Sequence, residues 1–444
     1  MELQNAHTPR ARIVWLSSDD APDEAAAALF DKAGYRLVAL EEARGADLAV
    51  LDLRRRRLSA KALQRIAAAI RRAAPECGFV HLAPASLSAS ERSHLRRSGE
   101  LVIAGGDLRG AVEICRQRLR LRNLAEETGE RLKSAAALAR ASSFPPIETA
   151  GAPPRTLIAG APGDAALAAL SAAERVSAET AGAMNAGQAM RSLETGAFDC
   201  AVLIPKGAGD PLLSLARAMR RHRKLHEIPV IVIPPPGAPG GPVEVAWRGA
   251  NVADVVLRAH VSEDLGGRIV LAARRARLAA AMRRFLSACA GEGVRDRLSG
   301  AFAPAFFAQH AERLFARSDQ TGRPLSLVAL RLFPAAPHAG PRALAEAARL
   351  VNRVTRAEDF VARLSPDTFI AVLSATGGAD AAVAAKRVEG VIANTMFRDG
   401  EREKVFAIAA AAGVAERAPG ARLEEALAGV LGRLSNVRPR AAKS

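Results

Sequence analysis

The chain has 444 residues, a length typical of about three domains, and its apolar content of 49% is sufficient for buried cores. Its four cysteines form no C-x-x-C pair, which argues against a metal cluster or a disulfide framework. No apolar run reaches the ~18 uncharged residues of a membrane span, and no signal sequence is evident, so we expect a cytoplasmic protein without a membrane partner.

The formal net charge of +17 comes from 63 basic and 46 acidic residues. Solvated, arginine-rich helix faces account for such a charge, and it also attracts acidic partners such as nucleotides. With one tyrosine, two tryptophans and no helix-turn-helix signature, the sequence does not favour nucleic acid as a partner.

Residues 11 to about 125 alternate between short apolar runs and amphipathic stretches, a pattern typical of a doubly wound α/β domain. Five strands and a glycine-rich last loop resemble a CheY-like (βα)5 receiver domain, which we place at residues 10–125. The predicted strands are 11–17, 35–40, 47–53, 78–83 and 101–104.

Asp52 ends the third predicted strand, where the receiver resemblance places a phosphoacceptor. The groups expected to support it are displaced: an acidic pair appears as Asp19-Asp20, two positions late, and Ala83 replaces a hydroxyl. Acyl-phosphate formation requires Mg²⁺ held by carboxylates and a nearby cation. The sequence leaves two interpretations of Asp52 open, a phosphoacceptor or a packing residue of a pseudo-receiver.

A long basic helix at 111–140 leaves this domain, and the segment 141–155, with four prolines among small residues, is typical of a linker. We therefore assign residues 126–155 to helix and linker.

A second set of strands is predicted at 156–161, 198–205, 228–235 and 253–259. The repeat predicts a second receiver-like fold at 156–265. Ile204 occupies its phosphoacceptor position, so this domain has no group to phosphorylate. A helix at 261–289 follows, and its residues 266–292 join the domain to the last third of the chain.

The stretch from Arg356 to Phe369, RAEDFVARLSPDTF, predicts a β-hairpin with the turn Ser365-Pro366-Asp367-Thr368. Apolar residues at helical spacing precede it, so Arg356 and Asp359 fall at the exit of an amphipathic helix. An arginine and an aspartate three apart commonly form a solvated ion pair and nothing more.

The order of these pieces, with DRLSG at 296–300, resembles a GGDEF domain of the diguanylate cyclase family, an α+β nucleotidyl-cyclase-like fold that we place at 293–440. Where an active enzyme has Gly-Gly-Asp/Glu-Glu-Phe, this chain has Ser365, Pro366, Asp367, Thr368 and Phe369. Proline lacks the N–H, and side chains block the close approach, that a Gly-Gly turn offers a triphosphate.

Three further departures concern metal, guanine and phosphate. Arg331 stands where the resemblance places a metal carboxylate, and a cation there repels Mg²⁺. Segment 334–341 lacks the guanine-reading Asn and Asp, and Leu434 replaces a phosphate-contacting lysine. We therefore expect no catalytic residues, no cofactor and no metal site.

The pair Arg356 and Asp359 matches the R-x-x-D inhibitory site of the same family, which binds cyclic di-GMP away from the catalytic turn. Arginine offers a planar fork of donors to phosphate or guanine, and a carboxylate accepts from guanine N–H groups. Arg387, on the predicted helix after the hairpin, stands where the family often adds an arginine, and Arg363 completes the pattern. The resemblance implies that these four residues bind cyclic di-GMP.

Two receiver-like domains followed by a GGDEF domain resemble response regulators of the PleD and PopA type. The resemblance implies a signalling role and homodimerisation through the receiver-like domains. Our preferred hypothesis is a non-catalytic cyclic di-GMP effector. The alternatives are an active or weakly active diguanylate cyclase, which alone would need Mg²⁺, and a dimeric scaffold that ignores nucleotides.

Overall fold

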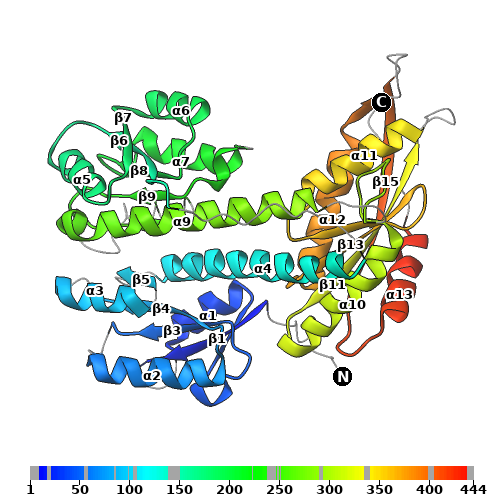
Figure 1. Cartoon of the computed structure of the whole chain (residues 1–444), viewed down its shortest axis with the longest axis horizontal. Coiled ribbons are helices and arrows are strands. Elements are labelled where there is room, and N and C mark those ends of the chain that lie inside the picture. Colours follow the sequence, from blue (N-terminus) through cyan, green and yellow to red (C-terminus); the bar gives the residue numbers. More distant parts are fainter. Residues whose placement is uncertain are drawn as a thin grey trace. The chain divides into compact units, whose positions relative to one another are not determined.

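The computed structural model contains three five-stranded sheets (Figure 1). Its backbone contacts divide the chain into two units. We call residues 12–121 and 147–281 the N-terminal unit, and residues 1–11, 122–146 and 282–444 the C-terminal unit. The structure describes residues 10–17, 22–54, 59–84, 87–98, 100–103, 108–138, 151–222, 224–237, 247, 250, 252–289, 294–334, 341–398 and 405–437.

The first sheet of the N-terminal unit has the strand order β2-β1-β3-β4-β5, and β1, β3, β4 and β5 pair in parallel. Side chains cap two of its helices, because Asp23 accepts from the N–H of Ala26 at 2.7 Å and Ser59 from that of Ala62 at 3.2 Å. The elements are β1 (Ala11–Leu16), α1 (Glu24–Lys32), β2 (Tyr35–Val38), η1 (Leu40–Glu42), β3 (Leu48–Asp52), α2 (Ala60–Ala73), β4 (Gly78–Ala83), α3 (Ala89–Ser98) and β5 (Glu100–Ile103).

The second sheet repeats this topology in the order β10-β9-β8-β6-β7, with every pair parallel. Its elements are β6 (Arg155–Gly160), α5 (Asp164–Glu174), β7 (Glu179–Ala183), α6 (Ala186–Thr195), β8 (Cys200–Ile204), α7 (Pro211–Arg221), η2 (Leu225–Glu227), β9 (Val230–Val232) and β10 (Asp254–Val255), followed by η3 (Arg258–His260). Both orders are the flavodoxin-like order of doubly wound sheets and are compatible with receiver-like domains.

The sequence did not predict β7, whose residues Glu-Thr-Ala-Gly-Ala are small or polar and mostly exposed. It is an edge strand with one neighbour, β6, so it has no need of an apolar face.

Two long helices, α4 (Arg109–Leu138) and α9 (Val261–Ala288), confirm the helices predicted at 111–140 and 261–289. We assigned residues 126–155 to helix and linker, and α4 is helical through Leu138. Residues 122–138 of α4 belong to the C-terminal unit, and Ala135 is buried in its core beside Phe302 and Phe306. None of the helices within the described ranges is long and apolar enough to cross a membrane.

The C-terminal sheet is antiparallel, with the strand order β12-β13-β11-β15-β14. Without the edge strand β14, its connectivity is the βαββαβ of ferredoxin-like folds. The elements are α10 (Pro304–Thr321), β11 (Leu325–Pro334), α11 (Pro341–Val354), β12 (Phe360–Arg363), β13 (Thr368–Ser374), α12 (Gly378–Ala393), β14 (Met396–Arg398), β15 (Val405–Glu416) and α13 (Leu423–Ser435).

Successive side chains of β11 point to opposite faces of this sheet, and each face has its own hydrophobic core. Leu327 and Ala329 pack on the side of α10 and α13, and Val328 and Leu330 on the side of α11 and α12 (Figure 1). Gly413 of β15 lets α13 approach, because a Cβ there would lie 2.6 Å from the backbone nitrogen of Leu434. The predicted hairpin is confirmed: β12 and β13 pair antiparallel, with Arg363 opposite Phe369.

Candidate functional site

The turn between α11 and β12 is closed by Asp359. One carboxylate oxygen accepts the backbone N–H of Arg356 at 2.8 Å, and the N–H of Asp359 donates back to the Arg356 carbonyl at 3.1 Å. These two hydrogen bonds stabilise the turn between Arg356 and Asp359, which the sequence predicted to follow the helix. The side chain of Arg356 is exposed, and no hydrogen bond from its guanidinium is found to any described residue.

The Asp359 carboxylate is partly buried. Burial raises its pKa to about 7, and the negative charge of Glu358 adds to the rise, while the N–H and the charge of Arg356 act in the opposite direction. The carboxyl group therefore changes charge near neutral pH. Such a perturbed carboxyl group, beside an exposed cation, is a candidate for ligand binding.

Arg387 of α12 joins this turn from a distant part of the chain. Its guanidinium donates to the carbonyl of Val354 at 3.0 Å, and so caps the C-terminal end of α11. Arg387 and Asp359 line one narrow cavity of about 20 Å³, whose other walls are largely apolar side chains of the sheet, α11 and α12. The structure thus brings Arg356, Asp359 and Arg387 together; we call these three residues the R-x-x-D site.

Arg363 does not share this site. It ends β12 at the opposite end from Asp359, and its guanidinium donates to the carbonyls of Ser365 at 3.1 Å and Pro366 at 3.0 Å. A third bond, at 2.9 Å, reaches the carboxylate of Asp296. We predicted that the Arg363 guanidinium binds a ligand together with Arg356. In the structure it links the turn Ser365-Pro366-Asp367-Thr368, which we call the signature turn, to the DRLSG segment at 296–300.

The signature turn is held by its own side chains. Asp367 accepts from the hydroxyls of Ser365 at 2.7 Å and Thr368 at 2.9 Å. Burial opposes its ionisation, but these hydrogen bonds and the nearby Arg331 hold the pKa of Asp367 below its usual value.

Arg331 lies beside this turn because it pairs with Thr368 in the β11–β13 register, and its Nε is 3.8 Å from an Asp367 carboxylate oxygen. The family resemblance implies Mg²⁺ here, and the residues do not fit it, because a guanidinium faces the carboxylate of the turn. Leu434 is 4% exposed and packs in the core, so it presents nothing to a phosphate. Most of the guanine-reading segment, residues 335–340, lies outside the described residues.

Asp52 ends β3 at the carboxyl edge of the first sheet, as the sequence predicted. Both of its carboxylate oxygens pair with the side of the Arg54 guanidinium, one at 2.9 Å from Nε and the other at 2.7 Å from Nη2. The same guanidinium reaches Asp23 at 3.0 Å. This arrangement favours the packing interpretation, and Asp19-Asp20 lie outside the described residues. Ile204, at the corresponding place in β8, is buried.

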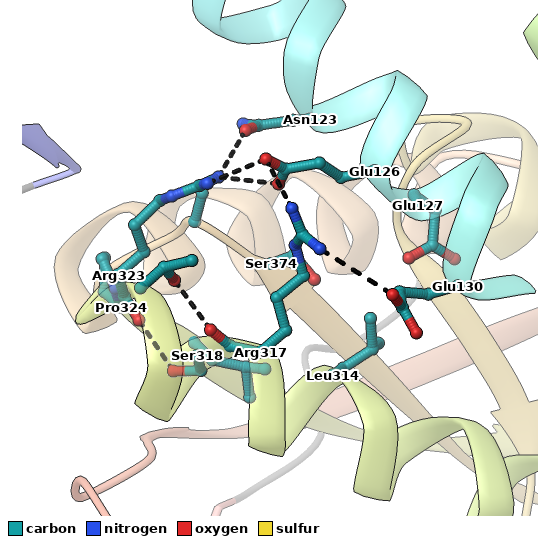
Figure 2. A pocket seen from close by; sticks show the side chains of 13 residues that line it. Asn123, Glu126, Glu127, Glu130, Leu314, Arg317, Ser318, Arg323, Pro324 and Ser374 are labelled. Carbon is teal, nitrogen blue, oxygen red and sulfur yellow. Dashed lines mark hydrogen bonds and ion pairs between the residues drawn. The ribbon is translucent and has the colours of Figure 1, made fainter. Parts of the chain in front are cut away.

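Sequence reasoning missed the contribution of α4 to the C-terminal unit. Figure 2 shows Glu126 of α4 between the side chains of Arg317 and Arg323 in a small pocket. The pocket has a volume of about 40 Å³, and Glu126 is bound by Arg323 at 2.8 and 2.9 Å and by Arg317 at 2.8 Å. Burial raises the pKa of Glu126, but these two arginines outweigh it and lower the pKa to about 2. The buried face of α4 is charged, so a search for apolar periodicity could not find it.

The comparisons with known proteins bear on this last unit. Residues 337–430 match the family described as "Diguanylate cyclase, GGDEF domain". Residues 337–430 are a GGDEF domain. No curated protein matches the chain by sequence.

Solved structures that are similar to part of this chain include a diguanylate cyclase and separate GGDEF domains. Diguanylate cyclase SiaD of Pseudomonas aeruginosa, solved with its activator SiaC, is 22% identical over 32% of this chain, with a TM-score of 0.30, and the match spans 57% of SiaD. The GGDEF domain of DgcB from Caulobacter crescentus, solved with c-di-GMP, is 18% identical over 33% of this chain and 88% of its own, with a TM-score of 0.30. The homology of this domain to diguanylate cyclases rests on the family match of residues 337–430.

Proposed function

We propose that this chain is a non-catalytic signalling effector that binds cyclic di-GMP at the R-x-x-D site of its GGDEF domain. The observation that carries the proposal is the meeting of Arg356, Asp359 and Arg387 at one end of α11, with the Arg356 guanidinium exposed. Arginine donors suit the phosphates or the guanine edge, and the carboxylate suits guanine N–H groups. That DgcB was solved with c-di-GMP supports this choice of ligand.

The signature turn supports the non-catalytic part of the proposal. Phosphoryl transfer depends on metal ions and positioned cations at the triphosphate. Here Arg331 faces Asp367, and Pro366 supplies no N–H in the turn. The second candidate function, a diguanylate cyclase, is favoured by the retained Asp367 and Phe369 and by the homology of the domain.

The domain order extends the proposal. Two sheets of flavodoxin-like order before the GGDEF domain are consistent with receiver-like domains of a PleD- and PopA-type response regulator. In this proposal the receiver-like domains mediate homodimerisation, Asp52 packs against Arg54, and the protein acts in the cytoplasm through protein partners.

Calorimetric titration tests the proposal. We expect cyclic di-GMP to bind the full chain with a micromolar or lower Kd, and GTP with Mg²⁺ or Mn²⁺ to yield no cyclic di-GMP on chromatography. Absence of binding heat would contradict the effector and leave the nucleotide-independent scaffold. Detectable product would establish the cyclase instead.

The pKa of Asp359 predicts a pH-dependent affinity. A carboxylate accepts hydrogen bonds from guanine, whereas the protonated acid donates one of its own. With a pKa of about 7, the ionised fraction falls from about nine-tenths at pH 8 to about one-tenth at pH 6, so the affinity for cyclic di-GMP should fall about tenfold. Titrations at the two pH values measure this change.

The variant Asp359→Asn is the control for the pH experiment, because its amide does not titrate. Its affinity should be equal at pH 6 and pH 8, and a persisting tenfold difference would assign the effect to another group.

The raised pKa of Asp359 also predicts how the free energy of unfolding depends on pH. Folded Asp359 binds its proton more tightly than an unfolded aspartate, whose pKa is about 3.9. Its contribution to the free energy of unfolding therefore falls as pH rises from about 4 to 7, and the Asn variant should lack this slope.

A further inference from the structure

The C-terminal half of α4 buries a polar cluster against α10. Glu127, Arg131, Ser134 and His310 are each at most 3% exposed. Arg131 donates to Glu127 through Nε at 2.8 Å and Nη2 at 2.5 Å, and a ring nitrogen of His310 lies 3.0 Å from the same carboxylate oxygen. Buried charges are costly unless they are paired, so this cluster holds α4 in one position on the domain.

The cluster has the order of a Ser-His-Glu triad, with Ser134 Oγ 2.9 Å from His310 Nδ1, but it is not a nucleophile site. Both side chains are fully buried, so no substrate reaches the hydroxyl. Ser134 also donates to the Glu130 carbonyl one turn earlier, at 3.0 Å. Its role is in packing between α4 and α10.

Arg131 extends the cluster to the R-x-x-D site. Its Nη2 lies 3.4 Å from the backbone carbonyl oxygen of Asp359, the residue whose carboxylate closes the α11–β12 turn. Its guanidinium carbon is 5.0 Å from the ring centre of Phe302 and 5.8 Å from that of Phe360. Both distances suit cation–π attraction. One arginine of α4 therefore contacts the backbone of Asp359 and the ring that follows it.

Two kinds of contact thus hold α4. The pairs of Glu126 with Arg317 and Arg323 involve no residue of the R-x-x-D site (Figure 2). The Arg131 contact with Asp359 is long for a hydrogen bond, and it ends on a turn whose other side would meet the ligand. A change in the position of this turn would therefore change the distance between Arg131 Nη2 and the Asp359 carbonyl oxygen.

We propose that Arg131 is a positioning residue of the ligand site, and that occupancy of this site tightens the packing of α4 on the GGDEF domain. The inference rests on the proposed function, because it takes cyclic di-GMP as the ligand. Arg131 fixes the Asp359 carbonyl from the buried side, while the ligand fixes the carboxylate from the open side. Coupling between two such contacts is reciprocal: ligand stabilises docked α4, and docked α4 raises ligand affinity.

Hydrogen exchange with mass spectrometry on the full chain tests the coupling. In wild type, saturating cyclic di-GMP should slow exchange in peptides covering 356–363, which report binding, and should slow exchange about fivefold or more in peptides covering 122–138, which report the response of α4. In the double variant Glu127→Gln/Arg131→Met, which leaves no unpaired buried charge, the response of 122–138 should be lost. Lys133→Met, an exposed position on the same helix, should behave as wild type.

Each outcome decides between the two proposals. Binding by calorimetry and protection at 356–363, without a response at 122–138, overturns the inference and leaves the effector function standing. Absence of binding in wild type overturns both. A double variant whose α4 responds as in wild type overturns the role of Arg131. Exchange of the β11 amides without ligand verifies that the double variant is folded.

Discussion

Replacing Arg131 with alanine should lower the free energy of unfolding of the C-terminal unit by about 3–5 kcal/mol, the typical cost of removing one partner of a buried ion pair. Glu127 would be left charged and about 3% exposed. The rings of Phe302 and Phe360 would also lose the guanidinium beside them. Arg131 lies in α4, which the sequence suggested was only a connection between domains. The decrease in the free energy of unfolding therefore measures how much α4 contributes to the stability of the C-terminal unit.

Denaturant-dependent hydrogen exchange of the β11 amides measures this loss. Tryptophan fluorescence serves as an internal control, because Trp15 and Trp247 both belong to the N-terminal unit and should report an unchanged transition. Lys133→Ala, whose side chain is 61% exposed, should cost less than about 0.5 kcal/mol. A loss below about 1 kcal/mol for Arg131→Ala would mean that α4 docks without this pair.

Replacing Arg356 with alanine should weaken cyclic di-GMP binding by tenfold to a hundredfold. A hydrogen bond to a charged group contributes roughly 1.5–3 kcal/mol, and 1.4 kcal/mol corresponds to a factor of ten. The guanidinium of Arg356 is exposed, so its removal should leave the stability of the domain nearly unchanged. Calorimetric titration at pH 8, where Asp359 is largely ionised, gives the two affinities.

Two further variants make this result specific. Arg387→Ala should also weaken binding, with some loss of stability, because Arg387 caps the Val354 carbonyl as well. Lys386→Ala removes the same charge from the neighbouring position of α12, which lies about 100° round the helix, and should bind as wild type. Equal weakening by Lys386→Ala and Arg356→Ala would indicate general attraction by positive charge in place of a defined site.

The same substitution pattern recurs at two places in the chain. Asp52 ends a strand where the receiver resemblance implies Mg²⁺, and Asp367 lies in the turn beside Arg331, where the GGDEF resemblance implies a metal carboxylate. Each of these aspartates is faced by an arginine of the chain. Arg54 Nη2 lies 2.7 Å from Asp52 Oδ2, and Arg331 Nε lies 3.8 Å from Asp367 Oδ2. A guanidinium supplies a fixed positive charge to the carboxylate, but it has no coordination sphere of the kind through which Mg²⁺ binds a phosphate oxygen and a carboxylate together. In our proposal, an arginine of the chain at each place supplies the positive charge that the family resemblances assign to Mg²⁺.

Much of the fold could be predicted because the apolar runs and turn residues of the sequence correspond to buried strands and exposed turns in the structure. Buried strands such as Leu48–Asp52 and Cys200–Ile204 are continuous apolar runs, as expected of parallel sheets covered on both faces. The hairpin was predictable because Ser-Pro-Asp-Thr is turn chemistry between two apolar runs. β7 was not, because an exposed edge strand of small and polar residues has no such pattern.

The sequence by itself determined most strands of the two parallel sheets, the hairpin and the turn that joins Arg356 to Asp359, because these depend on apolar runs and on turn residues a few positions apart. Only the tertiary structure decided that Arg387 joins them, that Arg363 turns away to Asp296, and that α4 contributes Arg131. Those contacts join residues 33, 67 and 228 positions apart. In each contact the donor is one arginine among many, and the acceptor is a backbone carbonyl or a carboxylate. Which arginine reaches which acceptor depends on the surfaces that the folded chain brings into contact, and local sequence patterns do not specify this.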